Sequence, residues 1–252
     1  IAGDETKNNL WLMNSRDEIK MIEVKNFSWD DLEGLAPFEG NAFLGMTSHS
    51  LTRSGKRKPE RENLILFQLK ENEVKMMKHW SLRDQLMDFI EKKVGSNVDV
   101  YRMRNSPPDQ GGLNIEGLGY LDGKIYLGVR SPLTKNGNAL IVTVGSPLSN
   151  LQLLEVTPVN LDGKGIRGID QDEQGLLILS GPVDDLPATF GLHRYDPRSI
   201  RTQVLHYAGF ENVMRPESLL KDNDGSLLLF QDFKVPQNQD VIMRLRPSAR
   251  AR

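Results

Sequence analysis

Apolar residues in this chain occur in short runs, and four of these runs follow the same lead-in. Each lead-in is a five-residue phrase with a charged third position, followed by a Gly turn and then by the apolar run. Short apolar runs bounded by turn residues are typical of buried β-strands. The phrases occupy residues 31–35, 114–118, 165–169 and 215–219. The chain is therefore predicted to repeat one unit of antiparallel strands.

The spacing of the phrases indicates the size of that unit. Glu116 and Arg167 are 51 residues apart, and Arg167 and Glu217 are 50 apart, a length that suits a four-stranded propeller blade. A blade must stack on neighbours to bury both faces, so the repeat predicts an all-β propeller in one domain over residues 1–252. Counting an incomplete unit at the N-terminus gives five four-stranded antiparallel blades, and six if residues before Ile1 belong to the natural protein.

The longest gap between two phrases contains the one predicted helix. The first two phrases are 83 residues apart, so about 32 residues are inserted there. Apolar residues recur at helical spacing over 82–94, with Ser81 as the predicted N-cap and Asp84 completing a capping box. The whole insertion, helix and loop, spans residues 81–112. We expect the helix to lie over the channel mouth as a lid.

The charged third positions of the phrases are the first candidates for function. In a propeller the innermost strand of each blade lines the channel, and the phrase lies where the chain enters that strand. We therefore expect these side chains to form a ring at one channel mouth: Glu33, Glu116, Arg167 and Glu217. Three converging carboxylates repel one another unless Arg167, a bound proton or a cation compensates. The alternative is structural, with these residues bonding to a neighbouring blade and the following Gly allowing close packing.

Oxygen ligands in a chain without cysteine suit Ca²⁺, Mg²⁺ or Mn²⁺. The predicted metal ligands are Glu33, Glu116 and Glu217. Glu116 and Arg167 are also predicted catalytic residues, together with His49 as a general acid or base.

The loops after the second strands are expected to open on the same face as the ring. Arg130, Ser131 and Asp232 lie in these loops and are predicted to bind the substrate, with Arg130 holding an anionic group. A basic loop over residues 53–61 is expected either to be a mobile, solvated loop or, where it overhangs the mouth, to attract phosphate or carboxylate groups.

The composition narrows the classes of partner. The 34 acidic and 32 basic residues nearly balance, which disfavours nucleic acid and membrane partners and leaves a small anionic or ester-type ligand as the expected one. A Gly-x-Ser-x-Gly elbow, a phosphate-binding Gly-rich loop and a His-x-x-x-His pair are all absent from the sequence. Because the chain begins at Ile1, we expect a periplasmic or secreted protein, with a cytoplasmic one as the alternative.

The repeated phrase also carries a family resemblance. Residues 114–118 and 128–133, together with the opening residues 3–6, closely resemble an uncharacterised bacterial propeller family of unknown function. The resemblance spans residues 4–246. More distantly, the chain is similar to the esterase-like phytase propellers and the gluconolactonase-type calcium propellers. Those relatives imply a metal-dependent hydrolase, and Arg167 departs from their acidic pattern.

These observations lead to two main hypotheses. The first is a metal-dependent hydrolase of an ester or phosphoester, in which Glu33, Glu116 and Glu217 hold the cation while Arg130 and Arg167 orient the anionic part. The second is a propeller that binds a ligand or another protein through the same face without catalysis. A third is a scaffold that docks a partner on the helix at 82–94.

Overall fold

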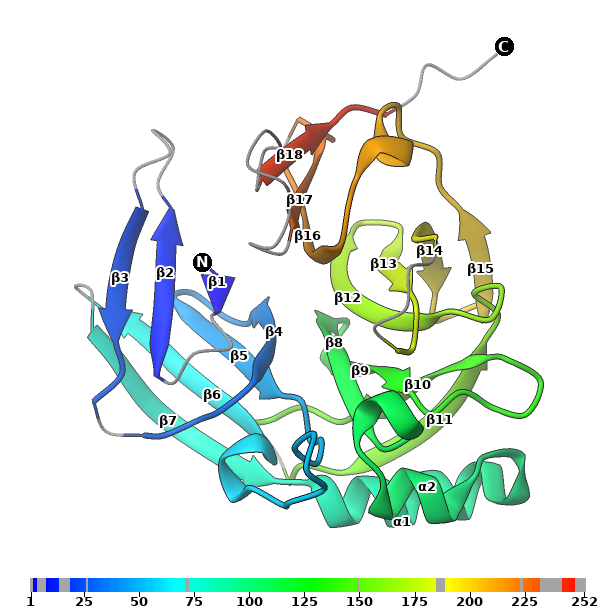
Figure 1. Cartoon of the computed structure of the whole chain (residues 1–252). Helices are drawn as coiled ribbons and strands as arrows, with labels where there is room; N and C mark the ends of the chain where they lie inside the picture. Colours follow the sequence, from blue (N-terminus) through cyan, green and yellow to red (C-terminus); the bar gives the residue numbers. More distant parts are fainter. Residues whose placement is uncertain are drawn as a thin grey trace.

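The computed structural model describes residues 2–3, 8–13, 19–25, 27–70, 73–148, 150–184, 189–222, 224–231 and 242–247. Within these residues the strands form five antiparallel sheets, each with its strands in sequence order. Figure 1 shows β4, β8, β12 and β16 nearest a common centre, with the later strands of each sheet further out. The predicted all-β propeller of antiparallel blades is therefore confirmed at this level.

The strands divide as follows. The N-terminal sheet contains β1 (Ala2–Gly3), β2 (Asn9–Met13) and β3 (Ile19–Glu23). The next contains β4 (Leu32–Pro37), β5 (Ala42–Thr47), β6 (Asn63–Lys70) and β7 (Glu73–Ser81). It is followed by β8 (Asn114–Leu121), β9 (Lys124–Ser131), β10 (Ala139–Val144) and β11 (Leu153–Val159). The last two contain β12 (Gly165–Asp172), β13 (Gly175–Gly181), β14 (Gly191–Asp196) and β15 (Arg201–Val204), then β16 (Pro216–Lys221), β17 (Leu227–Gln231) and β18 (Ile242–Leu245).

The number of blades differs from the expectation. Four sheets begin with a strand that carries the repeated phrase, and we count these as the blades of the described chain. The N-terminal sheet has no such strand, so a count of five or six blades is not supported. The fourth blade has three described strands, β16, β17 and β18.

Each phrase makes the same irregularity in its strand. The pairing register shifts between Leu32 and Gly34, and the corresponding shift recurs in the three later blades. The residue that each shift skips is the charged third position of the phrase: Glu33, Glu116, Arg167 and Glu217. A β-bulge of this kind re-aims a side chain out of the regular pleat. The repeated phrase is therefore a repeated bulge.

The Gly after the charged position joins neighbouring blades. A methyl group at Gly34 would lie 2.6 Å from Cβ of Leu118 in the next blade. The same addition at Gly117 would lie 2.7 Å from Ile169, and at Gly168 it would lie 3.0 Å from Leu219. Each Gly thus receives the last apolar residue of the phrase in the following blade, and only glycine leaves room for it. This confirms the predicted role of the Gly in close packing.

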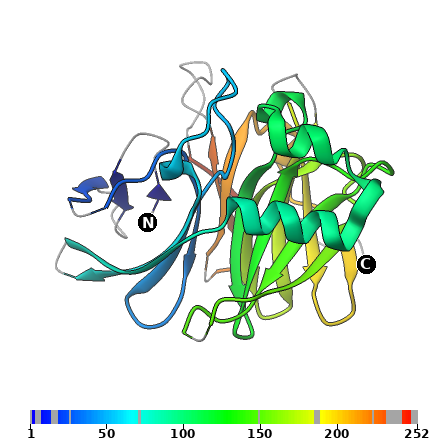
Figure 2. The ribbon, with the colours of Figure 1, turned by 90° about the horizontal axis from the view of Figure 1, so that it is seen from below.

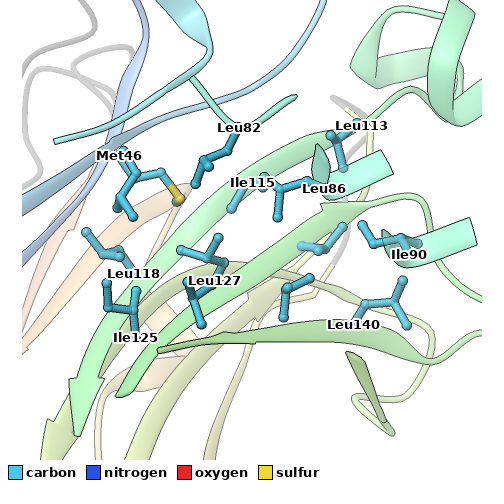
Figure 3. Close-up of a cluster of buried hydrophobic side chains, with 14 of the residues drawn as sticks. Met46, Leu82, Leu86, Ile90, Leu113, Ile115, Leu118, Ile125, Leu127 and Leu140 are labelled. Atoms are coloured by element: carbon cyan, nitrogen blue, oxygen red, sulfur yellow. The ribbon is translucent and has the colours of Figure 1, made fainter. Parts of the chain in front are cut away.

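The largest hydrophobic cluster lies between the first two blades and the inserted helix. Met46 of β5 packs with Leu118 and Leu127 of the next blade, and Leu86 and Ile90 of the helix belong to the same cluster (Figure 3). All five side chains are at most 1% exposed. The cluster fixes the orientation of β8, the strand that carries Glu116.

The inserted segment forms α1 (Arg83–Val94) and the shorter α2 (Val100–Asn105), which agrees with the helix predicted at 82–94. The predicted cap is wrong, because Leu82 is the N-cap and makes no side-chain capping bond, while Ser81 ends β7. α1 packs against the outer strand β11 (Figures 1 and 2). None of the described helices combines the length and the apolarity that a membrane span requires.

Candidate functional site

A cavity of about 1430 Å³ lies at the end of the inner strands where the bulges occur. All four bulged residues line it: Glu33, Glu116, Arg167 and Glu217. The predicted ring of charged side chains at one channel mouth is therefore confirmed as geometry. The bulges bring these residues together although up to 184 positions separate them in the sequence.

Glu116 is the most firmly held member of the ring. Asn114 Nδ2 donates a hydrogen bond to Glu116 Oε1 at 2.9 Å, and Arg130 Nη1 donates to the same oxygen at 2.7 Å. Arg167 Nε lies 3.6 Å from Glu116 Oε2, so the two form an ion pair but not a hydrogen bond. The side chain of Glu116 is 5% exposed, and its Oε2 makes no hydrogen bond.

Arg167 is shared between two carboxylates. Its Nη2 donates to Glu217 Oε2 while its Nε faces Glu116. Burial lowers the pKa of Arg167, but the fields of Glu116, Glu217 and Glu33 outweigh this effect and raise the pKa above its usual value. Gly181 makes room for the side chain, because a methyl group there would lie 2.6 Å from Cδ of Arg167.

Glu217 differs from Glu116 in its surroundings. Its side chain is 37% exposed and faces the cavity, with Arg167 as its ion-pair partner. Removal from bulk water raises the pKa of Glu217 to about 7, Arg167 opposes this shift, and repulsion from Glu116 adds to it. A carboxyl group with this pKa is partly protonated at neutral pH.

The three glutamates do not fit a divalent metal ion. Arg167 is ion-paired to both Glu116 and Glu217, so a guanidinium group sits where a cation would have to bridge them. Among the residues that the structure describes, no group of three or more His, Asp or Glu side chains is arranged to hold a metal. Glu33 lines the cavity and is half-buried, and it contributes to the field on Arg167.

Arg130 holds a neighbouring loop. The register of β8 and β9 also shifts between Asn114 and Ile115, which makes Arg130 a bulged residue on β9. Its Nε donates to the carbonyl of Pro182 at 3.0 Å and its Nη2 donates to the carbonyl of Asp184 at 2.9 Å. These bonds tie Glu116 to the loop that follows β13. The contacts favour a positioning role, whereas the predicted binding of an anionic group stays a prediction.

The other predicted site residues lie elsewhere. Ser131 is 2% exposed and does not line the cavity. Asp232 lies outside the described residues. The lid predicted from the insertion is also absent from the described mouth, because no residue of α1 lines the cavity and only Pro108 and Asp109 of the insertion's described loop reach it.

His49 is buried beneath the mouth. It is fully buried and is not among the residues that line the cavity, so the geometry does not bring it to a ligand there. Its Nδ1 lies 2.7 Å from the carbonyl of Thr47 and donates to it, which leaves Nε2 as an acceptor without a hydrogen bond. The pKa of His49 is lowered to about 4, mainly by burial and to a smaller extent by Arg83, while the hydrogen bond to Thr47 opposes the shift. A neutral, enclosed imidazole does not match the predicted general acid or base.

The basic loop over residues 53–61 is largely neutralised by acidic neighbours. Lys58 contacts Asp30 at 2.5 Å, and Arg61 Nη1 contacts Asp31 at 2.9 Å. Arg57 donates to Glu62 and to Asp84 of α1. The expectation that this loop attracts anions is therefore wrong for these three residues, because their charges hold the loop in place.

Three aromatic residues, Phe190, Tyr207 and Phe210, form an apolar part of the cavity wall for which the sequence contains no signal. Tyr207 and Phe210 lie in the connection between the third and fourth blades, which also contains the short 3₁₀ helix η4 (Phe210–Asn212). Phe190, after β13, lines the cavity beside Arg167, since both side chains pack on Gly181. These aromatic residues have no common period, and only the fold brings them together.

A family model matches residues 66–226, which is more than half of the chain. The chain belongs to the DUF3616 family. The description of DUF3616 is a protein of unknown function. No curated protein matches the chain. The family match covers β8 to β16 completely and includes three of the four bulged residues.

Solved structures similar to this DUF3616 chain are distant. A Lactobacillus plantarum protein shares 9% identity with a TM-score of 0.40, over 88% of this chain and 55% of that one. An extracellular domain from a two-component system protein of B. thetaiotaomicron shares 13% identity with a TM-score of 0.38, over 96% and 25%. The Pyrococcus horikoshii acylaminoacyl peptidase shares 14% identity with a TM-score of 0.31, over 90% and 36%. The chain thus spans from 25% to 55% of the length of these proteins.

Proposed function

We propose that the cavity at the channel mouth binds a small polar ligand. The observation that carries this proposal is the ring of charged side chains that lines the cavity, which forms the charged base, or floor, of the cavity. Each of its members lies on a β-bulge of a different blade: Glu33, Glu116, Arg167 and Glu217. Of the two main hypotheses from the sequence, this is the binding propeller.

Stability alone does not account for such a base. Buried ion pairs such as Glu116–Arg130 lose hydration, and replacing them by packed apolar residues is often neutral or stabilising. The cavity also has enough volume for a small molecule, and Glu217 presents part of its carboxylate to it. Charges that are costly to bury and that face an accessible cavity support a role in recognition.

The proposal is tested by a ligand-observed NMR screen of small polar fragments. The variants compared are Glu217→Gln, at the cavity, and Glu173→Gln, an exposed residue in the turn between β12 and β13 at the other end of its blade. We expect a set of fragments whose saturation-transfer signal is weakened by Glu217→Gln and unchanged by Glu173→Gln. Fragments that bind equally to all three proteins, or no binding fragments, would overturn the proposal.

A second candidate, hydrolysis at the same site, is favoured by the raised pKa of Glu217. A carboxyl group with a pKa of about 7 that faces a cavity can donate and accept a proton near neutral pH. Glu116, held by Asn114 and two guanidinium groups, would keep its neighbours oriented. The substrates proposed remain esters and phosphoesters.

This candidate is tested with a panel of esters, lactones and phosphoesters, with and without a chelator. Turnover that depends on a group of pKa about 7, is lost in Glu217→Gln and is insensitive to the chelator would support proton transfer by Glu217. Turnover that the chelator abolishes, together with metal found by elemental analysis, would instead support the metal-dependent mechanism predicted from the sequence.

A further inference from the structure

We infer that the ligand of this cavity carries a positively charged amine attached to an apolar or aromatic body. The inference rests on the proposed function, since it specifies the class of molecule that the cavity takes. It replaces the small anionic or ester-type ligand expected from the sequence.

The first support is the charge of the cavity wall. Five arginines line the cavity: Arg53, Arg61, Arg130, Arg167 and Arg215. Seven carboxylates line it: Asp31, Glu33, Asp109, Glu116, Asp184, Glu211 and Glu217. The wall therefore carries an excess of negative charge, which favours a cationic ligand over an anionic one.

The second support is that three of the arginines that line the cavity already make hydrogen bonds or ion pairs with groups of the protein. Arg130 donates to Glu116 and to two backbone carbonyls, and Arg167 is shared between Glu116 and Glu217. Arg61 pairs with Asp31 at 2.9 Å. An anion would have to displace carboxylates or carbonyls from these guanidinium groups, and each displaced group would then lose its partner.

The third support is the state of Glu217. Its carboxylate is partly exposed in the cavity, and the field of Glu116 together with burial disfavours its charge. An ammonium group beside Glu217 would compensate that charge in place of a proton. Glu33 lines the same cavity and adds to the negative field that Arg167 experiences. Glu116 has an oxygen, Oε2, that is buried without a hydrogen bond.

The fourth support is the apolar wall. Phe190, Tyr207 and Phe210 line the cavity, and all three are half-buried. Aromatic faces attract ammonium groups and bury apolar surface at the same time. Aromatic side chains and a ring of carboxylates that line the same cavity match a ligand with an apolar body and a cationic head.

The test uses three probes of nearly equal shape: benzylammonium, benzyl alcohol and benzoate. Binding to ¹⁵N-labelled wild type, Glu217→Gln and Glu173→Gln is followed by chemical-shift changes at the amides of the cavity residues. For wild type we expect benzylammonium to bind about tenfold more tightly than either other probe. This preference should be lost in Glu217→Gln and kept in Glu173→Gln.

Two outcomes would overturn the inference. If benzoate or benzyl alcohol shifts the cavity amides at least as strongly as benzylammonium does, the cavity does not select a cation, but the proposed binding function still stands. If none of the probes shifts those amides, the inference fails, and the fragment screen described above decides the proposed function by itself. The amide spectra also report whether each variant is folded.

Discussion

The second and fourth copies of the repeated phrase place a glutamate at the same β-bulge and give it opposite surroundings. Glu116 is 5% exposed and is held by Asn114, Arg130 and Arg167. Glu217 is 37% exposed, is ion-paired with Arg167 and has a pKa raised to about 7. The backbone therefore sets where the carboxylate lies, while the neighbouring side chains set how far it is buried and which groups it pairs with.

The difference originates within each blade. In the second copy Asn114 stands two positions before the glutamate and donates to it, and Arg130 of the paired strand β9 adds a guanidinium group. In the fourth copy the position of Asn114 is occupied by Arg215, and Arg167 reaches Glu217 from the previous blade. Glu116 thus has two hydrogen-bond donors in its own blade besides the ion pair with Arg167 of the next blade, whereas Glu217 is bonded by Arg167 across a blade boundary.

The largest effect is expected for Glu116→Gln, which removes the charge of the more buried glutamate. The substitution keeps the shape but leaves Arg130 and Arg167, each with 9% exposed side chains, without their shared carboxylate. Removing one partner of a buried ion pair costs about 3–5 kcal/mol, so we expect a loss of that size in the free energy of unfolding, measured in urea. Glu173→Gln, on an exposed turn, should change it by less than about 0.5 kcal/mol. A similar small loss for both variants would show that the charge of Glu116 is not needed for stability.

A second substitution, Gly34→Ala, is expected to displace the bulge at Glu116 without changing any charged residue. In Gly34→Ala the added methyl group would lie 2.6 Å from Cβ of Leu118 and 3.3 Å from its backbone nitrogen, so β8 itself must shift. Overpacking of this kind costs about 1–3 kcal/mol. We expect that loss in urea unfolding, together with amide shift changes at Glu116 but not at Glu217.

Gly145→Ala is the matched control for that experiment. The nearest atom to a methyl group at Gly145 would be a backbone oxygen at 3.7 Å, which is an ordinary contact. If Gly34→Ala and Gly145→Ala destabilise the protein equally, the packing of Gly34 on Leu118 does not position the bulge.

The ring of charged residues could be predicted from the sequence because the phrase that contains them recurs at regular intervals. A repeat of about 50 residues fixes the blade, and a phrase at a constant place in the blade must return to the same channel mouth. The close packing of Leu118 on Gly34 could also be predicted, because both residues belong to copies of the repeated phrase. The bulges themselves had no signal, because a Glu between Leu32 and Gly34 also fits a regular strand.

The sequence analysis is wrong or silent where the contacts join segments that do not belong to the repeated phrase. His49 is predicted from its residue type as a general acid or base, but the fold buries it, and it is 0% exposed. The helix α1 was expected over the mouth, but Leu86 and Ile90 find their apolar partners in the blade of β8 to β11 instead. The aromatic wall at Tyr207 and Phe210 depends on the joint between two blades, which local patterning does not encode.

The smallest effect is expected for the titration of Glu217, measured as the pH dependence of the free energy of unfolding. The folded pKa of Glu217 is about 7, above the ordinary value of 4.5, so the folded protein binds more protons than the unfolded chain between these values. The free energy of unfolding should therefore fall as the pH rises from about 4.5 to about 7. The contribution should be about 1 kcal/mol or less, because more than a third of the side chain is exposed and water screens its charge.

Glu217→Gln removes this titration and should flatten the profile of urea-unfolding free energy against pH, while Glu173→Gln should leave the slope intact. Because Gln keeps the shape of the side chain, a change in the slope of unfolding free energy against pH would be due to the lost titration of residue 217 and not to altered packing. An unchanged slope in Glu217→Gln would mean that the carboxylate titrates as an ordinary surface acid. The two copies would then differ only in burial, and both the proton transfer proposed for Glu217 and its attraction for an amine would lose their basis.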